Sequence, residues 1–173
     1  MRIDYLFGRP TQQHWEDLEL WEKVLNRFEG KLHWIIELGT FQGAMSYFLF
    51  AQAEARKMRF ATYDLYRPEK PVPNFYVHDV LESNVFPPFY DYPQDYPGVL
   101  FCDNGNKPLE VATYHSEIHP ESLIAVHDWG TEFLAKDIPN GYGTVFYSNT
   151  TIFLASHDVL HRNGLGTVQV IAK

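Results

Sequence analysis

The sequence is poor in cysteine and holds no long apolar run. Its 173 residues include one cysteine, Cys102, which cannot form a disulfide within the chain and therefore fits a reducing compartment. No apolar run approaches the ~20 residues that a helix needs to cross a bilayer. Residues 1–8 also lack the apolar stretch of a signal peptide. We therefore expect a cytoplasmic protein without a membrane partner.

Basic residues are scarce relative to acidic ones, at 14 against 22, and the net charge is −8. A surface this acidic repels phosphate backbones, so we expect no nucleic-acid partner. The sequence shows no internal repeat or low-complexity segment, and residues 1–173 are predicted to form a single domain. A chain of this length buries roughly 70% of its unfolded surface, enough for a full core.

The order of elements predicts an α/β fold. Residues 11–29 have apolar side chains at helical spacing and predict an amphipathic helix capped by Thr11, so residues 1–32 are predicted as an N-terminal helical segment. Further along, apolar runs at 33–38, 59–66, 74–80, 98–103 and 122–127 predict strands, and residues 43–57 and 108–118 predict helices. This alternation indicates a mostly parallel sheet covered by helices on both faces, in three layers. Residues 130–143 are predicted to be irregular, and 150–155 and 167–172 to form a closing antiparallel pair.

Residues 34–50 join a buried strand, a glycine turn at residues 39–43 and the start of a helix. A helix start offers unpaired N–H groups, and glycine lets a ligand approach the backbone, so this stretch predicts a site for a nucleotide-like ligand. The spacing Gly39-x-x-x-Gly43 lacks the close G-x-G of the dinucleotide fingerprint. Glu37, just before the turn, favours a ligand with a cationic end.

Carboxylates stand at or beside the ends of the first five predicted strands, at Glu37, Asp64, Asp79, Asp103 and Asp128. The carboxyl ends of parallel strands share one edge of a sheet, so these acids should gather in one crevice. Crowded carboxylates raise one another's pKa values unless a ligand or cation offsets the repulsion. A carboxylate at the end of the second strand, here Asp64, can accept the ribose hydroxyls of an adenosine.

Three segments resemble class I S-adenosylmethionine-dependent methyltransferases, especially the catechol O-methyltransferase-like and methyltransferase 24 groups. Residues 37–46 (ELGTFQGAMS) resemble their motif I, 102–107 (CDNGNK) resemble the segment after strand four, and 125–129 (AVHDW) resemble the segment after strand five. The resemblance covers about residues 33–173. It implies a Rossmann-like methyltransferase fold with an antiparallel final strand and a bound S-adenosylmethionine.

The resemblance also implies roles for individual residues. The methionine part of the cofactor would be held by Glu37, by the turn residues Gly39, Thr40, Phe41 and Gly43, and by Ser46. Asp64 would bind the ribose, Asp79 with His78 the adenine, and Asp103 would lie beside the sulfonium. The acids would then stabilise a cationic cofactor and need not exchange protons.

Methyl transfer needs a deprotonated acceptor held in line with the methyl group. His127, with an ordinary pKa near ~6.5, is the first candidate base, with a structural histidine as the equal alternative. Lys107 is a weaker candidate, and Asp128 joins them in the predicted catalytic set. Related enzymes hold Mg²⁺ with two aspartates and an asparagine, of which Asp103 and Asp128 match two. Trp129 stands in place of the asparagine, so Mg²⁺ is the less favoured alternative.

The predicted function is methyl transfer from S-adenosylmethionine to a small molecule, at oxygen. A non-catalytic S-adenosylmethionine-binding module and an NAD(P)-dependent oxidoreductase are the alternatives. Two histidine pairs, His115 with His119 on the helix after strand four and His157 with His161 in the last turn, are interpreted as surface residues rather than metal ligands. The aromatic loop at 86–96 would line the acceptor pocket, cover the core or contact a second subunit, which leaves a homo-oligomer open.

Overall fold

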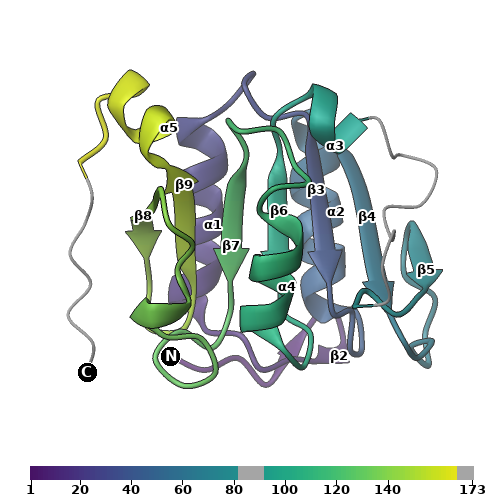
Figure 1. Ribbon diagram of the computed structural model, residues 1–173. Coiled ribbons are helices and arrows are strands. Elements are labelled where there is room, and N and C mark those ends of the chain that lie inside the picture. Colours follow the sequence, from purple (N-terminus) through teal and green to yellow (C-terminus); the bar gives the residue numbers. More distant parts are fainter. Residues whose placement is uncertain (82–91, 167–173) are drawn as a thin grey trace.

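The computed structural model describes residues 1–81 and 92–166. A seven-stranded sheet with the order β5-β4-β3-β6-β7-β9-β8 lies at its centre (Figure 1). Its strands are β3 (Trp34–Leu38), β4 (Arg59–Asp64), β5 (Phe75–Val77), β6 (Val99–Cys102), β7 (Leu123–Val126), β8 (Tyr142–Tyr147) and β9 (Ile152–Ser156). The first five pair in parallel, β9 is antiparallel to β7, and β8 is antiparallel to β9. The predicted mostly parallel α/β fold, with its antiparallel final strand, is confirmed.

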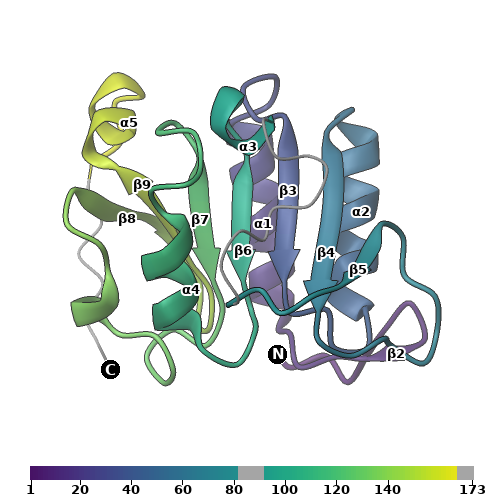
Figure 2. The same ribbon diagram turned by 45° about the vertical axis from the view of Figure 1, so that its right-hand side comes forward.

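The sheet separates two apolar clusters, as the alternation of side chains along a strand requires. On β3, Ile35 packs toward helices α1 (Trp15–Arg27) and α2 (Ala44–Ala55), whereas Trp34 and Ile36 pack toward α4 (Lys107–Tyr114). Figures 1 and 2 show α4 on one face of the sheet and α1 and α2 on the other. Because both faces of the sheet are covered, the strands read in the sequence as continuous apolar runs.

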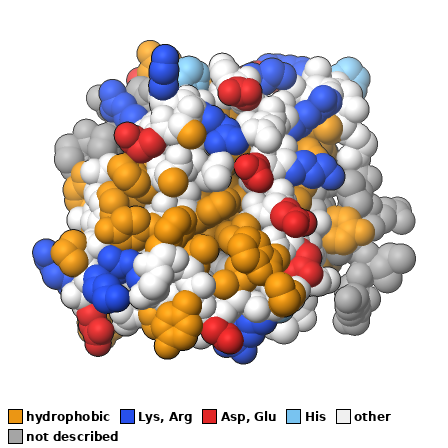
Figure 3. All heavy atoms as spheres, turned by 180° about the vertical axis from the view of Figure 1, so that it is seen from behind, with side chains coloured by type: hydrophobic (Ala, Val, Ile, Leu, Met, Phe, Trp, Pro, Cys, Tyr) orange, Lys and Arg blue, Asp and Glu red, His pale blue; other side chains and the backbone are white. Residues whose placement is uncertain are grey.

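Figure 3 shows the face on the side of α1 and α2, where apolar side chains gather between scattered charged ones. Helix α2 contributes to this surface because Phe48 and Phe50 are only partly buried against the core. No helix in the described part of the chain is both long and apolar enough to span a bilayer.

The C-terminal third departs from the prediction. Strand β8 covers the end of the segment predicted to be irregular, and helix α5 (His157–Arg162) follows β9 directly where a turn was expected. Strand β8 was not predicted because Gly141 and Gly143 are typical of irregular segments. Helix α5 is capped by Ser156, whose hydroxyl accepts a hydrogen bond from the Val159 N–H. The predicted strand 167–172 lies outside the described residues.

The histidine pairs lie on other elements than predicted. Strand β9 starts beside Val126 and runs back, so α5, with His157 and His161, lies at the edge opposite the crevice. Helix α4 ends at Tyr114, before His115 and His119, so these two do not share a helix face. Most of the aromatic loop at 86–96 falls in the undescribed segment, and its end forms the short helix α3 (Tyr92–Asp95).

The N-terminal segment is not wholly helical, which corrects the prediction for residues 1–32. Two short strands, β1 (Tyr5–Leu6) and β2 (Arg9–Pro10), pair in antiparallel fashion before α1 begins. Thr11 accepts a hydrogen bond from the Gln13 N–H and does not cap the helix. Asp17, inside the first turn, accepts the N–H of His14 instead. The segment runs along the edge where the parallel strands end (Figure 1), which places it over the predicted crevice.

Candidate functional site

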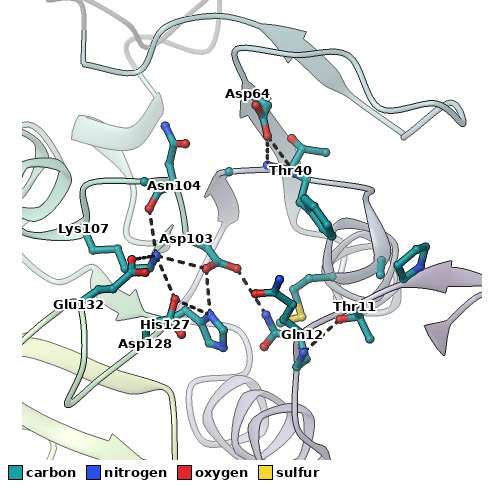
Figure 4. Close-up of a pocket in the computed structure, with 17 residues that line it drawn as sticks. Thr11, Gln12, Thr40, Asp64, Asp103, Asn104, Lys107, His127, Asp128 and Glu132 are labelled. Atoms are coloured by element: carbon teal, nitrogen blue, oxygen red, sulfur yellow. Dashed lines mark hydrogen bonds and ion pairs between the residues drawn. The ribbon is translucent and has the colours of Figure 1, made fainter. Parts of the chain in front are cut away.

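A cavity of about 310 Å³ opens at the carboxyl ends of the parallel strands (Figure 4). It is bounded by the glycine turn, by the ends of β4, β6 and β7, and by the N-terminal segment. Its lining residues are Pro10, Thr11, Gln12, Gln13, Gly39, Thr40, Phe41, Ala44, Met45, Asp64, Asp103, Asn104, Gly105, Lys107, His127, Asp128 and Glu132. Polar and charged side chains from separate elements therefore face one space.

The glycine turn is fixed by close packing against β6. Gly39 has a φ of 99°, and a Cβ at this position would come within 2.5 Å of the Asp103 carbonyl oxygen. Only glycine suits both the backbone angle and the space. Gly43, with a φ of 78°, stands immediately before α2, so the helix starts at the cavity wall, where Ala44 and Met45 line it.

Asp64 closes the turn from the neighbouring strand. One carboxylate oxygen accepts the backbone N–H groups of Thr40 and Phe41, each at 2.9 Å. Figure 4 shows the Asp64 carboxylate beside Thr40. The other accepts the Tyr66 N–H at 3.1 Å. Asp64 thus lines the cavity and also holds the turn, a second task that its position in the sequence did not indicate.

Glu37 and Ser46 meet each other behind the turn rather than in the cavity. Both are fully buried, and Glu37 accepts the hydroxyl groups of Ser46 at 2.5 Å and Thr62 at 2.6 Å. Burial raises the pKa of Glu37 to about 8, although these two hydrogen bonds oppose the shift. At neutral pH the carboxyl group is therefore mostly protonated, and it lies behind the turn, outside the cavity lining.

The predicted cofactor-binding residues divide into two groups. The structure places Gly39, Thr40, Phe41, Asp64 and Asp103 in the cavity lining. It places Glu37, Gly43, Ser46, His78 and Asp79 outside the lining. His78 and Asp79 follow β5 at the far edge of the sheet, where the Asp79 carboxylate accepts the N–H of Leu81. Their predicted adenine contact stays a prediction.

The predicted catalytic residues lie together in a charge cluster, defined here as Asp103, Lys107, His127, Asp128 and Glu132. Lys107 is at its centre: its Nζ lies 2.7 Å from Glu132, 3.1 Å from Asp128 and 3.9 Å from Asp103. The Nζ also donates to the backbone carbonyl of Asn104 at 3.0 Å. The side chain is only 4% exposed, although the cluster borders the cavity.

Asp128 owes its place to an unusual backbone angle. Its φ is 57°, in the left-handed region that aspartate tolerates better than most residues. From there its carbonyl accepts the N–H groups of Thr131 and Glu132 in a tight turn. This turn brings the Glu132 carboxylate back toward Lys107.

His127 is held by two carboxylates. Its Nδ1 lies 3.0 Å from Asp103 and 3.5 Å from Asp128. Burial lowers the pKa of His127, but the hydrogen bonds and the charges of the two aspartates outweigh it and raise the pKa to about 10. The same contacts lower the pKa of Asp128 to about 2. The imidazole therefore keeps its proton at neutral pH, unlike the unperturbed group assumed from the sequence, and its role as a base stays a prediction.

Three contributors to the site carried no sequence signal. Gln13 reaches Asp103, with Nε2 3.4 Å from the carboxylate, across a sequence separation that no motif spans. Glu132 belonged to a segment predicted to be irregular. Arg9, almost fully buried, donates to the backbone carbonyls of residues 42, 70 and 71 and lies over the Tyr47 ring at 4.6 Å. Arg9 thereby fastens the N-terminal segment to the glycine turn.

A divalent metal does not fit the predicted ligands Asp103 and Asp128. Among the described residues, Asp103, His127 and Asp128 offer ligand atoms within 4.8 Å of one another. The Lys107 ammonium already lies 3.1 Å from Asp128, however, and His127 Nδ1 contacts both carboxylates, at 3.0 Å and 3.5 Å. A cation bound by these oxygens would meet the Lys107 charge at close range.

By sequence, no family profile and no curated protein matches the chain. By structure, it resembles cmcI with SAH, with a TM-score of 0.60 and 10% identity over 81% of this chain and 72% of that one. It also resembles the MycE methyltransferase of the mycinamycin biosynthetic pathway in complex with Mg, SAH and mycinamycin VI (TM-score 0.55, 11% identity, 82% and 46% covered). A third similar structure is the SAH-bound methyltransferase PaMTH1 of Podospora anserina (0.53, 10%, 80% and 77%).

The chain has the Rossmann-like methyltransferase fold. At identities of 10–11% the likeness shows the fold alone, and the chain spans less than half of the MycE chain. Fold does not fix function, so the activity depends on the groups that line the cavity.

Proposed function

We propose that the protein binds S-adenosylmethionine in this cavity and transfers its methyl group to an oxygen of a small molecule. The observation that carries the proposal is that the glycine turn, the start of α2 and the acids Asp64 and Asp103 border one cavity. The fold, shared with structures that hold SAH, supports the same ligand.

The charges of the site suit a cationic cofactor. With Lys107 and His127 protonated, the cluster sets two positive charges against the three carboxylates of Asp103, Asp128 and Glu132. The remaining negative charge stabilises the positively charged sulfonium of the cofactor at the cavity. It does not stabilise the uncharged thioether of the product. The site would thus bind the cofactor more tightly than its product.

The cofactor's other parts find suitable groups. The start of α2, at Ala44 and Met45, offers backbone N–H groups to the methionine carboxylate. Asp64, at the end of β4, would accept one ribose hydroxyl at Oδ1, the oxygen that receives only the Tyr66 N–H. Glu37 and Ser46 would act through the turn, by fixing its position from behind.

In the reaction, an acceptor oxygen forms a bond to the methyl carbon as the bond from sulfur to that carbon breaks. The acceptor must lose its proton first or during the step. Because His127 and Lys107 both hold protons at neutral pH, the site is better suited to an acceptor that arrives ionised, such as a carboxylate or an acidic enol or phenol.

Ligand binding separates this proposal from an NAD(P)-dependent oxidoreductase. We expect S-adenosylhomocysteine to raise the melting temperature in proportion to the logarithm of its concentration, and NAD and NADP to leave it unchanged. Asp64→Asn should weaken S-adenosylhomocysteine binding, measured by calorimetry, about tenfold, the equivalent of one charged hydrogen bond. The matched control is Asp158→Asn, an exposed residue on α5 at the opposite edge, which should bind like the wild type.

Turnover separates an enzyme from a non-catalytic module. Transfer of a labelled methyl group should be measured with a panel of carboxylic acids, phenols and alcohols. Stabilisation by NAD but not by S-adenosylhomocysteine would reject the proposal. Binding of S-adenosylmethionine with no transfer to any acceptor would instead support the non-catalytic alternative.

A further inference from the structure

The Lys107 ammonium has the surroundings of a bound cation. Three oxygens lie within hydrogen-bond distance: Glu132 Oε2 at 2.7 Å, the Asn104 carbonyl at 3.0 Å and Asp128 Oδ2 at 3.1 Å. The first two accept hydrogen bonds from Nζ and the third forms an ion pair with it, so an ammonium with three N–H donors has three oxygen partners here. The Lys107 side chain is only 4% exposed, so protein oxygens rather than water form most of its surroundings.

The same oxygens are of the kind that Mg²⁺ and Mn²⁺ bind. These metals prefer carboxylate, carbonyl and water oxygens in octahedral geometry. Asp103 lies on the same side, with its carboxylate 3.9 Å from Nζ. The cluster therefore has the ligand types of a divalent site, but its centre is filled by a side chain of the protein.

We propose that the Lys107 ammonium is the resident cation of this site and takes the place of a divalent metal. Lys107 holds the carboxylates of Asp128 and Glu132 together at the cavity edge, as a bound ion would. The wild-type site therefore recruits no divalent metal, and removal of the ammonium should expose a site that does. This inference concerns metal binding and does not depend on methyl transfer, so it can fail while the proposed function stands.

The test is a titration with Mn²⁺, followed by the loss of the free-ion signal in electron paramagnetic resonance, with no cofactor or acceptor present. Lys107→Met keeps most of the length of the side chain and removes the charge. We expect this variant to bind Mn²⁺ at least tenfold more tightly than the wild type. Mn²⁺ should also raise the melting temperature of Lys107→Met and leave that of the wild type unchanged.

Three variants control for charge and for location. Lys136→Met removes the same charge from an exposed position of the segment after β7 and should bind Mn²⁺ like the wild type. Lys107→Arg keeps the cation and should gain no metal. Adding Asp128→Asn to Lys107→Met should abolish the gained binding.

Two results would overturn the inference. One is a folded Lys107→Met variant that binds Mn²⁺ no better than the wild type. The other is tight Mn²⁺ binding by the wild type that Asp128→Asn removes, and this result counts even if Lys107→Met fails to fold.

Discussion

At the scale of single residues, His127 should keep its proton to a pH at which a free imidazole has lost it. Asp103 and Asp128 favour the charged form, so the pKa is raised to about 10 despite burial. Titration by NMR of the histidine ring signals should show His127 protonated at pH 8. In Asp103→Asn the midpoint should fall by more than one unit, because the contact at 3.0 Å loses its charge.

The control is Asp158→Asn, which removes an exposed charge at the opposite edge of the sheet and should leave the His127 midpoint at its wild-type value. A His127 signal that titrates near the free value in the wild type would restore the imidazole as a neutral-pH base.

The residues found from the sequence are those at or just after the end of a strand. Asp64, Asp103 and Asp128 were placed at one edge because the carboxyl ends of parallel strands meet there. What the sequence did not indicate was how they are used: Asp64 holds backbone N–H groups, and Asp128 pairs with Lys107. Such contacts depend on angles and distances of the folded chain that strand position alone does not determine.

At the scale of elements, Arg9 decides whether the N-terminal segment closes the cavity. Its guanidinium donates to three backbone carbonyls, and the residues that follow it, 10–13, line the cavity. Arg9→Met should leave these carbonyls without their donor. We expect a loss of about 1–3 kcal/mol in the free energy of unfolding, together with weaker binding of S-adenosylhomocysteine.

The control for this prediction is Arg2→Met, an exposed position of the same segment. Urea unfolding and calorimetry should show wild-type values for it. If Arg9→Met is destabilised but binds the ligand normally, the segment is only a structural cover, and the cavity wall does not depend on its attachment.

The element order also shows where prediction from the sequence stops. Buried central strands were found because packing on both faces makes them continuously apolar. Strand β8, at the sheet edge, is buried only in its middle and contains Gly143, so its start was mistaken for part of an irregular connection. The N-terminal hairpin of β1 and β2 was not predicted because each strand has two residues, too few for any periodicity.

At the scale of the whole molecule, buried acids should make the protein more stable at mildly acidic than at alkaline pH. The pKa of Glu37 is raised to about 8 and that of Glu110 to about 7, in both cases chiefly by burial. A raised folded-state pKa gives stability that is fully present below the unfolded value, near 4.5, and is lost as the pH rises through the folded value. His127, raised to about 10, loses its contribution over a higher range, as the pH passes from its unfolded value toward 10.

At acidic pH the free energy of unfolding depends on Asp128, whose pKa is lowered to about 2. Its contribution is present above its ordinary value of 3.8 and disappears as the pH falls toward 2, so the free energy of unfolding should be greatest at about pH 4. From there to pH 8 it should fall, and Glu37 alone would account for a slope of at most about 1.4 kcal/mol per pH unit.

Glu37→Gln tests which group produces this slope. The amide keeps an oxygen that accepts the hydroxyl groups of Ser46 and Thr62, and it cannot ionise. Urea unfolding at pH 5.5, 7.0 and 8.5 should therefore give a flatter dependence for Glu37→Gln than for the wild type. Glu69→Gln, at an exposed position, should keep the wild-type slope. If Glu37→Gln retains the full slope, Glu37 is already ionised in the folded protein, and the carboxylate behind the turn would then add its charge to those that attract a sulfonium.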